Sequence, residues 1–213
     1  MTRTKYYTVW KGRRRGVFSS WGECEKQVKG YIGAEFKAFD SMAEATRALA
    51  GRYQDYAGKA SSNGKWRSAH HKPQLPSIAV DAACSGSPGL LEYRGVITDS
   101  GKELFRAGPF AEGTNNVGEF LALVEALRWL QENKRDWVVY SDSENAIGWV
   151  RRGRARTKLK RTSANRQLFQ LIAQAEAELT SAQPPGAGLL SDHKILKWRT
   201  AEWGEIPADF GRK

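Results

Sequence analysis

The pattern of hydrophobic and polar positions changes along the chain, and the first fifty residues combine short apolar runs with amphipathic stretches. Two of these stretches begin with a Ser followed three residues later by a Glu, at Ser20–Glu23 and Ser41–Glu44. This spacing is a capping box, in which the Ser and Glu side chains bond to free backbone N–H groups of the first helical turn. With strands expected over residues 6–10, 17–18 and 35–39, the two helices predict a small ββαβα module.

From residue 76 onward the pattern predicts a larger domain. Three strand-like segments come first, over residues 77–83, 90–98 and 102–110, and a helix follows from 117 to about 133. The remaining expected elements are a strand at 137–141, helices at 144–151 and 165–179, a strand at 195–198 and a helical turn at Pro207. Three consecutive strands followed by alternating helices and strands predict an α/β fold, with a mixed five-stranded sheet and helices on both faces.

Residues 52–75 separate these two regions and have no sustained periodicity. They contain Gly, Ser, Asn and Pro, a composition typical of a flexible linker. We therefore expect a module over residues 1–51, a linker over 52–75 and a large domain over 76–213.

Positive charge is concentrated in the first third of the chain. The formal net charge is +11, and residues 1–75 carry 15 Lys or Arg against 6 Asp or Glu. This imbalance favours a polyanionic partner, and nucleic acid fits better than a membrane because no basic amphipathic helix with a long apolar face is apparent. Signal-peptide and membrane-spanning runs are absent from the sequence pattern, and Cys24 and Cys84 form no metal-ligand spacing. We expect a cytoplasmic protein with reduced thiols and no membrane or obligate protein partner.

Four carboxylates lie in segments that are otherwise apolar or glycine-rich: Asp81, Glu119, Asp142 and Asp209. Burying unpaired charge is unfavourable by several kcal/mol or more, and a hard divalent cation such as Mg²⁺ offsets this penalty. If the first and fourth strands of the large domain are neighbours, Asp81 and Asp142 project near each other and Glu119 approaches from the helix. Four acids around two cations about 4 Å apart form a phosphodiester-cleaving site. The alternative is four unrelated surface acids in a chain that has 23.

Four motifs in this order resemble a type 1 ribonuclease H across essentially all of residues 76–213. They are VDAACSG at 80–86, TNNVGEFL at 114–121, YSDS at 140–143 and WGEIPADFGRK at 203–213. The resemblance implies that Asp81, Glu119, Asp142 and Asp209 hold two Mg²⁺ ions, for which Mn²⁺ is a plausible substitute. It also implies hydrolysis of the RNA strand of an RNA/DNA hybrid, with 3′-hydroxyl and 5′-phosphate ends. Glu205 resembles an acid that assists product departure in one branch of the family.

The same resemblance assigns substrate contacts. It implies RNA-strand contacts for Asn115 and Glu144, and DNA-strand contacts for Thr114, Asn116, Thr157 and Trp149. The alternatives are that Asn115 and Asn116 cap a helix and that Trp149 belongs to the core. Three features depart from relatives: Glu144 replaces a common Gln, His193 does not match the mobile-loop His of many members, and the basic handle helix is missing. Residues 151–161, with seven Lys or Arg and no acid, are either a partial substitute for the handle or a solvated basic loop.

Residues 1–50 resemble the hybrid-binding domain that precedes many such enzymes. The matching segments are YTVWKG at 7–12, GVF at 16–18, Trp21 with Cys24, and EFKAF at 35–39. The resemblance implies that Tyr7, Trp21, Phe36 and Lys37 contact the hybrid, while Ala38 replaces a second Lys of some relatives. The alternative is that Tyr7 and Phe36 form the small core.

Two rival functions remain open at this point. One is a non-catalytic protein that binds hybrids or double-stranded RNA. The set of four acids argues against it, because a surface that binds phosphates gains nothing from clustered negative charge unless a metal is bound. The other is a DNA nuclease or strand-transfer enzyme with the same fold, which the fold alone does not exclude.

Overall fold

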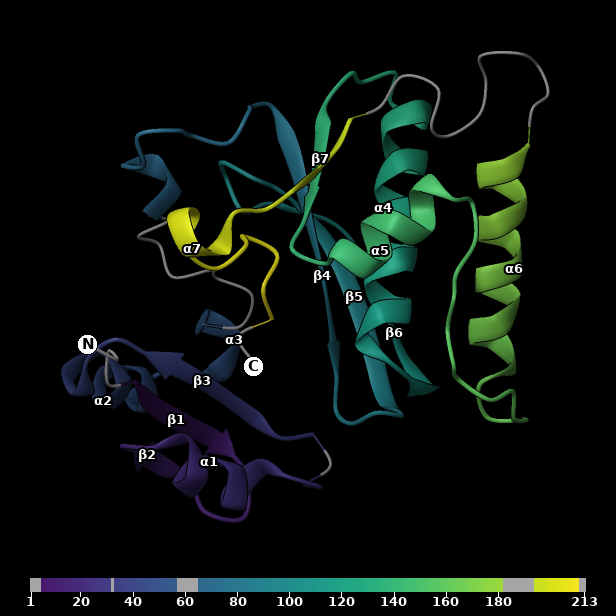
Figure 1. The fold of residues 1–213 in the computed structure, drawn as a ribbon. Coiled ribbons are helices and arrows are strands. Elements are labelled where there is room, and N and C mark those ends of the chain that lie inside the picture. The colour runs from purple at the N-terminus through teal and green to yellow at the C-terminus, as the bar shows by residue number, and fades with distance from the viewer. Residues whose placement is uncertain (1–4, 32, 57–64, 182–193, 211–213) are drawn as a thin grey trace. The chain divides into compact units, whose positions relative to one another are not determined.

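The computed structural model describes residues 5–31, 33–56, 65–181 and 194–210 (Figure 1). Contacts divide the chain into two compact units, Met1–Lys59 with Phe210–Lys213 and Ala60–Asp209. No helix in the described part of the chain has the length and apolar character needed to cross a bilayer.

The first unit has the predicted ββαβα order. Its elements are β1 (Tyr6–Lys11), β2 (Gly16–Phe18), α1 (Trp21–Val28), β3 (Glu35–Phe39) and α2 (Met42–Ala50), and its sheet has the order β2-β1-β3 with antiparallel pairs. Both expected helix starts are confirmed, because Ser20 Oγ accepts from the N–H of Glu23 at 3.3 Å and Ser41 Oγ accepts from the N–H of Glu44 at 3.2 Å.

This unit continues beyond residue 51. The indole Nε1 of Trp10 donates to the carbonyls of Ala48 and Gly51, both at 3.0 Å. A short helix, α3 (Tyr53–Tyr56), then places Tyr56 in a stacked contact with Trp10, with ring centroids 5.5 Å apart. Aromatic packing therefore orders residues 53–56 within the span expected to be a linker, while residues 57–64 of that span lie outside the described residues.

The second unit contains a five-stranded sheet in the order β6-β5-β4-β7-β8. Its strands are β4 (Ser77–Cys84), β5 (Gly89–Ile97), β6 (Glu103–Gly113), β7 (Val138–Ser141) and β8 (Ile195–Lys197). The pairs among β4, β5 and β6 are antiparallel, whereas β7 pairs in parallel with β4 and β8. The predicted mixed sheet is confirmed, and β4 and β7 are neighbours at its centre.

Helices cover one face of this sheet. Helix α4 (Asn115–Glu132) contacts it through a cluster that includes Ile78, Val80 and Ala82 of β4. Helices α5 (Glu144–Arg151) and α6 (Arg166–Thr180) pack beside α4, and α5 also contacts β7 and β8 while α6 contacts β6 (Figure 1). Helix α4 is buried on nearly all sides, which is typical of a central helix in a layered domain.

A second cluster covers the other face of the sheet. It contains Ala79 and Tyr140 of the strands together with Trp198, Trp203, Ile206 and Ala208 of the C-terminal segment, where a short helix, α7 (Thr200–Trp203), lies. Because side chains alternate along a strand, Asp81 has the same parity as Ala79 and faces this second side.

The segment just before β4 belongs to this second cluster and is not a free tether. Trp66, in the 3₁₀ turn Lys65–Arg67, is 5% exposed and packs in the cluster. The indole of Trp203 donates to the carbonyl of His71 at 2.6 Å, and the N–H of Gln74 donates to Tyr140 Oη at 2.9 Å. Residues 65–75 of the expected linker are therefore held to the second unit by one buried Trp and two specific hydrogen bonds.

Some element boundaries differ from those expected. Helix α4 begins two residues earlier than predicted, and α7 was not predicted. Pro207 is the second residue of a turn and does not begin a helix: the N–H of Asp209 donates to the carbonyl of Ile206 at 2.8 Å, and no helix follows up to residue 210, the last one described. Proline favours the second position of such a turn as strongly as the first turn of a helix, so its presence alone could not separate the two.

Candidate active site

The register between β4 and β7 brings two of the predicted acids together. Ser77 is paired with Val138, Ile78 with Val139 and Ala79 with Tyr140. Strand β7 ends at Ser141. Continuing the constant register by two residues places Asp142 opposite Asp81, at the point where β7 stops.

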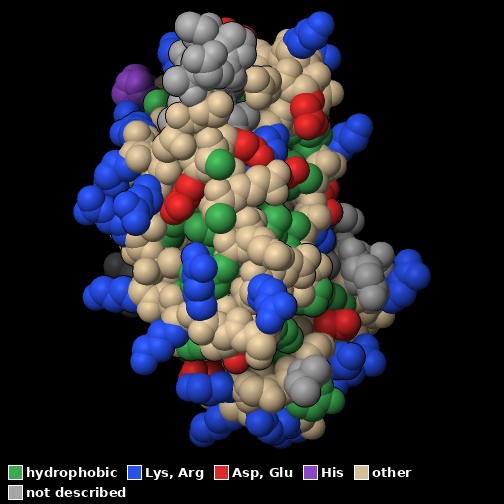
Figure 2. All heavy atoms as spheres, turned by 90° about the vertical axis from the view of Figure 1, so that its right-hand side faces the viewer, with side chains coloured by type: hydrophobic (Ala, Val, Ile, Leu, Met, Phe, Trp, Pro, Cys, Tyr) green, Lys and Arg blue, Asp and Glu red, His purple; other side chains and the backbone are tan. Residues whose placement is uncertain are grey.

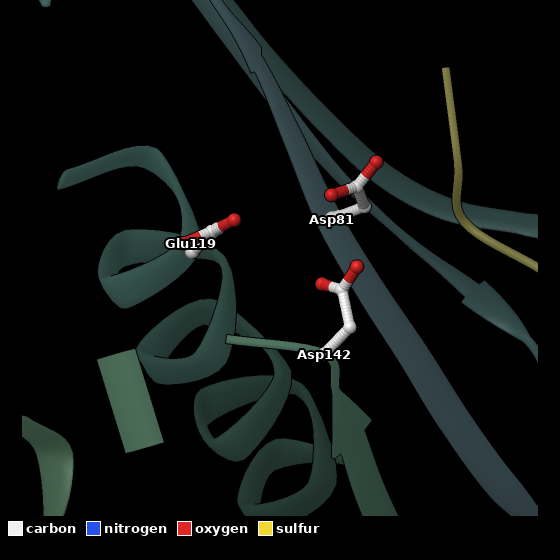
Figure 3. A group of neighbouring side chains, drawn as sticks. All are labelled: Asp81, Glu119 and Asp142. Carbon is white, nitrogen blue, oxygen red and sulfur yellow. The ribbon is translucent and has the colours of Figure 1, made fainter. Parts of the chain in front are cut away.

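Glu119 reaches the same point from α4. One carboxylate oxygen from each of Asp81, Glu119 and Asp142 lies within 4.8 Å of the others, and the three side chains converge from different elements (Figure 3). Asp81 is fully buried and Glu119 is 8% exposed. Three carboxylates are therefore gathered in a largely enclosed position.

The chemistry of this group suits a divalent cation. Two like charges about 5 Å apart repel by roughly 3 kcal/mol at an effective dielectric constant of about 20. Within the described part of the chain, Oδ2 of Asp81 and Oδ1 of Asp142 are buried and accept no hydrogen bond, although both residues interact with other groups. Hard carboxylate oxygens at this spacing are the ligands that Mg²⁺ and Mn²⁺ prefer, so the residues present fit such an ion.

The other two predicted acids lie in the C-terminal segment. Asp209 is 9% exposed and follows the turn that begins at Ile206, but it is not a member of the three-carboxylate group found among the described residues. Glu205 is exposed. A ligand role for Asp209 and a catalytic role for Glu205 stay predictions.

A cavity of about 690 Å³ lies in the same unit and gathers the residues expected to contact the DNA strand. Thr114, Asn116, Trp149 and Thr157 all line it. Three basic residues of the connector between α5 and α6 line it too: Arg156, Lys158 and Lys160. Hydroxyl, amide and cationic groups in one hollow provide the donors that phosphate oxygens need.

The three residues with competing interpretations can now be placed. Asn115 and Asn116 are the first two residues of α4 and both are exposed, while the N-cap position belongs to Thr114, which makes no side-chain capping bond. Trp149 is 7% exposed and packs edge-on against Phe120, with ring centroids 6.1 Å apart. Its burial supports the core interpretation, and its ring also lines the cavity.

Basic side chains extend beyond the cavity. Figure 2 views the molecule from the side on which α6 lies in Figure 1, and Lys and Arg side chains are spread over this face with Asp and Glu side chains between them. Residues 151–161 contribute seven Lys or Arg and no acid. Their positive potential favours a polyanion near the cavity.

Two protein families match this chain. Residues 75–184 match the family described as RNase H, and residues 5–49 match the ribonuclease H1 N-terminal domain. The chain belongs to the ribonuclease H family. It has the type 1 arrangement, in which an N-terminal hybrid-binding domain precedes the ribonuclease H domain.

Curated ribonucleases H share parts of this chain. The Pelobacter propionicus protein is 35% identical over 108 residues, which is 47% of this chain and 65% of that protein. The Cupriavidus metallidurans protein is 34% identical over 113 residues, 48% of this chain and 75% of that protein. A short stretch of 40 residues, 19% of this chain, is 48% identical to 8% of the Crithidia fasciculata protein. The chain thus spans less than two thirds of the Pelobacter and Crithidia relatives.

Two solved structures are also similar. The crystal structure of RNase H1 from Halobacterium salinarum is 20% identical, with a TM-score of 0.39, and the match covers 62% of this chain and 91% of that one. LC11-RNase H1 in complex with an RNA/DNA hybrid is 26% identical, with a TM-score of 0.35, over 59% of this chain and 87% of that one.

Glu144, the departure from many ribonucleases H, is exposed and pairs with an exposed lysine. Lys197 on β8 donates to Glu144 Oε1, and this hydrogen bond lowers the pKa of Glu144. Lys197 therefore offsets the negative charge that Glu144 would otherwise present to a phosphate.

The aromatic residues predicted for the hybrid-binding domain of this ribonuclease H lie together. The rings of Tyr7 and Trp21 are 5.5 Å apart, and those of Trp21 and Phe36 are 5.8 Å apart. Trp21 is 38% exposed, whereas Phe36 is buried in the small core. Lys37 follows Phe36 on β3, so its side chain leaves from the other face and donates to the carbonyl of Tyr56 at 2.9 Å. The three aromatics share a face that Lys37 does not.

Three contributors escaped the sequence interpretation. Gly118 allows α4 to pack closely on the sheet beside Glu119. Arg94 donates a hydrogen bond to the backbone of Asp209. Trp66 packs in the same cluster as Ile206 and Ala208 of the segment that carries Asp209. Only Arg94 left a signal in the sequence, as a basic residue inside a strand that otherwise reads as buried. The other two depend on contacts between distant segments.

Proposed function

We propose that this protein is a Mg²⁺-dependent endoribonuclease that hydrolyses the RNA strand of RNA/DNA hybrids by two-metal-ion catalysis, leaving 3′-hydroxyl and 5′-phosphate ends. The observation that carries the proposal is the convergence of Asp81, Glu119 and Asp142 within 4.8 Å, in a domain of the ribonuclease H family. Mn²⁺ is the expected substitute ion, because it accepts the same oxygen ligands.

Each acid has a proposed task. Asp81, Glu119 and Asp142 would hold the ions, and Asp209 would complete the ligand set from the C-terminal segment. Bound cations supply a lowered pKa for the attacking water and stabilisation of charge on the leaving oxygen. Glu205, exposed just before the turn that begins at Ile206, would assist product departure.

Substrate contacts follow from the cavity and its neighbours. Thr114, Asn116 and Thr157 would bind a DNA-strand phosphate, with Trp149 against a deoxyribose. Asn115 and Glu144 would contact the RNA strand, where a 2′-hydroxyl distinguishes RNA from DNA. The basic residues that line the cavity support a phosphate ligand there.

The first unit would supply affinity for the hybrid. Tyr7, Trp21 and Phe36 would pack on the nucleic acid, and stacking is worth about 1–3 kcal/mol for each base reached. Lys37, on the other face of β3, would act through its charge alone. We propose a hybrid-binding unit that ends near Tyr56 and a catalytic unit that begins near Lys65. A cytoplasmic location and the absence of an obligate protein partner stay predictions.

The proposal is tested with labelled RNA/DNA, RNA/RNA and DNA/DNA duplexes, each with Mg²⁺ and with a chelator. We expect cleavage of the RNA strand of the hybrid alone, and only with the metal. Binding without cleavage of any duplex would favour the non-catalytic alternative, and cleavage of DNA/DNA would favour a DNA nuclease.

Asp142→Asn tests the site itself. The substitution removes one anionic ligand oxygen and keeps the shape of the side chain, so we expect single-turnover cleavage to slow by about a hundredfold or more. Hybrid affinity, measured by fluorescence anisotropy without divalent metal, should change less than twofold. The matched control is Asp136→Asn, an exposed acid outside the group. Cleavage by Asp142→Asn at the wild-type rate would refute the site assignment.

A further inference from the structure

Arg94 is the most deeply buried cation of the described residues, and its contacts are unusual. It lies on β5 and is 2% exposed. Its Nε donates to the carbonyl of Ala208 at 2.8 Å, and its Nη2 donates to the carbonyl of Asp209 at 2.6 Å. Nη1 reaches Glu103 at 3.4 Å. One guanidinium therefore holds two consecutive carbonyls of a segment that lies far away in sequence.

The register of the sheet puts Arg94 beside the acidic group. Arg94 is the cross-strand partner of Asp81. Directly opposed residues of an antiparallel pair point to the same face of the sheet, so both side chains face the C-terminal segment. In Figure 3 the yellow C-terminal segment passes on the side of β4 toward which Asp81 points.

The electrostatic surroundings disfavour the charged form of Arg94, so its hydrogen bonds must offset the cost of burying the charge. Burial lowers the pKa of Arg94, and repulsion from Arg106 lowers it further, while Glu103 and Asp81 act in the opposite direction. Taking a guanidinium out of water is unfavourable by several kcal/mol, and hydrogen bonds must offset this. Two of those bonds go to the backbone carbonyls of Ala208 and Asp209.

The segment around Asp209 depends on such contacts because it has no regular secondary structure after α7. Trp198 Nε1 donates to the carbonyl of Gly204 at 2.9 Å, and the side chains of Ile206 and Ala208 are buried in the second cluster. Arg94 fixes the far end of the segment, at Ala208 and Asp209. The exposed Glu205 thus lies between two anchored points.

We propose that Arg94 is a positioning residue that fixes the backbone of Ala208 and Asp209 next to Asp81, so that the Asp209 carboxylate is directed at the acidic group. The inference rests on the proposed ligand role of Asp209. Arg94 itself touches neither the ions nor the substrate in this role. It acts through the backbone that carries the fourth acid.

Two variants of Arg94 separate positioning from general support. Arg94→Met keeps most of the side-chain volume and removes every donor. Arg94→Lys keeps the charge, but a single ammonium group does not reproduce the fork that binds two carbonyls. The matched control is Glu103→Gln, which alters the same guanidinium on its more exposed side and leaves both carbonyl bonds in place.

The first readout is the binding of Mn²⁺ alone, measured by calorimetry on the full chain without substrate. Loss of a group that orients a metal ligand typically weakens metal binding by about 10- to 100-fold. We expect Arg94→Met and Asp209→Asn each to weaken Mn²⁺ binding by about tenfold or more, and Arg94→Lys by less. Glu103→Gln should bind Mn²⁺ as the wild type does.

The second readout is a double-mutant cycle. If Arg94 acts through Asp209, the variant carrying Arg94→Met and Asp209→Asn should bind Mn²⁺ no more weakly than the weaker single variant. In hybrid cleavage, the half-saturating Mg²⁺ concentration and kcat should change in the same variants, with KM for the hybrid within twofold. Additive losses in the cycle would overturn the proposal.

Failure of the proposal is distinct from failure of the proposed function. Weakened Mn²⁺ binding by Asp209→Asn with wild-type binding by Arg94→Met would overturn the role of Arg94 and leave the enzyme assignment standing. A wild type that binds Mn²⁺ but cleaves no hybrid would overturn the function, while the binding cycle still decides the role of Arg94. If Arg94→Met does not fold, Arg94→Lys decides: wild-type Mn²⁺ binding by that variant refutes positioning.

Discussion

Gly118 lies at a close contact between α4 and the sheet, one residue before Glu119. A Cβ atom at this position would lie 2.5 Å from Leu91 Cδ1 and 2.7 Å from Ala82 Cβ, so the helix or the sheet must move to admit it. Overpacking of this kind is unfavourable by about 1–3 kcal/mol, against about 1 kcal/mol gained from the helix propensity of Ala. We expect Gly118→Ala to lower the thermal unfolding midpoint and, by displacing Glu119, to slow hybrid cleavage about tenfold or more.

Gly148→Ala on α5 is the control for helix propensity alone. Its new methyl group would lie 3.2 Å from the flexible end of Arg152, which can move away. We expect unchanged or slightly higher stability and wild-type cleavage. If both variants lose cleavage equally, close approach at Gly118 is not what places Glu119.

The pairing of Glu144 with Lys197 leads to a charge prediction for hybrid affinity. Because the hydrogen bond from Lys197 lowers the pKa of Glu144, this carboxylate is charged at neutral pH and loses its charge only as pH falls through that lowered pKa. Solvent screens an exposed pair of this kind, so changing one partner should alter hybrid affinity only a few-fold. Glu144→Gln should therefore tighten hybrid binding by about two- to fivefold, since it releases Lys197 toward phosphate.

Lys197→Met should weaken binding by a similar factor, because an uncompensated acid then faces the phosphates. The double variant should return close to the wild type. Fluorescence anisotropy at two salt concentrations measures all three. Tighter binding by Lys197→Met would contradict an RNA-strand contact at this position.

Some residues of the site could be predicted from the sequence and others could not. Asp81 interrupts an apolar run and Asp142 ends one. An acid in an apolar run is rarely placed there without a partner or a ligand, so the sequence itself points to these two residues. Gly118 carries no such signal, because the reason for a glycine there is its close contact with Leu91, which lies on β5 and is distant in the sequence. The role of Arg94 likewise depends on a partner more than a hundred residues later, which a local pattern does not contain.

At the scale of elements, the predictions held where periodicity or capping chemistry was strong. The capping boxes at Ser20 and Ser41 fixed two helix starts, and the long run after Val117 fixed α4. The order of residues 65–75 is not visible in the sequence, because a single buried Trp does not create a repeating hydrophobic pattern. Pro207 was mistaken for a helix start, because a turn uses the same φ angle.

Trp66 offers a direct test of whether residues 65–75 are part of the catalytic unit. Its indole is 5% exposed among Trp198, Trp203 and Ile206. Truncation of a buried Trp to Ala is unfavourable by about 3–5 kcal/mol. We expect Trp66→Ala to lower the free energy of unfolding, measured in urea on the full chain, by about 3 kcal/mol. Cleavage should fall too, since the cluster supports the segment that carries Asp209.

Trp21→Ala is the contrasting variant, because Trp21 is 38% exposed in the first unit. It should weaken hybrid binding and leave the urea transition of the second unit in place. A Trp66→Ala protein as stable as the wild type would restore the linker interpretation for this segment.

At the scale of the whole molecule, the excess of positive charge lies before residue 76 and the three gathered carboxylates lie after it. Residues 1–75 hold 15 of the 34 Lys and Arg but only 6 of the 23 Asp and Glu. The three gathered carboxylates all lie in the second unit. The uneven charge was visible in the sequence, and so was the order of the two regions. The true ends of each folded unit were not, because they depend on packing by Trp10 and Trp66.

This division predicts how the enzyme responds to salt when its first unit is removed. The deletion should extend through Tyr56, because α3 packs on Trp10 and a cut at residue 51 would leave an aromatic helix without its partner. Each phosphate contact contributes about 0.9 to the slope of the logarithm of the binding constant against the logarithm of salt concentration. We expect the deletion to raise KM for the hybrid about tenfold or more at low salt and to reduce this slope by at least one contact, with kcat nearly unchanged.

Trp21→Ala in the full chain separates charge from packing in that result. It removes an aromatic contact and no charge, so it should raise KM without altering the salt slope. Steady-state cleavage of a labelled hybrid between about 50 and 200 mM salt measures both variants over the range in which phosphate contacts dominate. If the deletion keeps the wild-type KM and slope, the basic residues up to Tyr56 do not hold the substrate, and the positive charge of the second unit must account for binding.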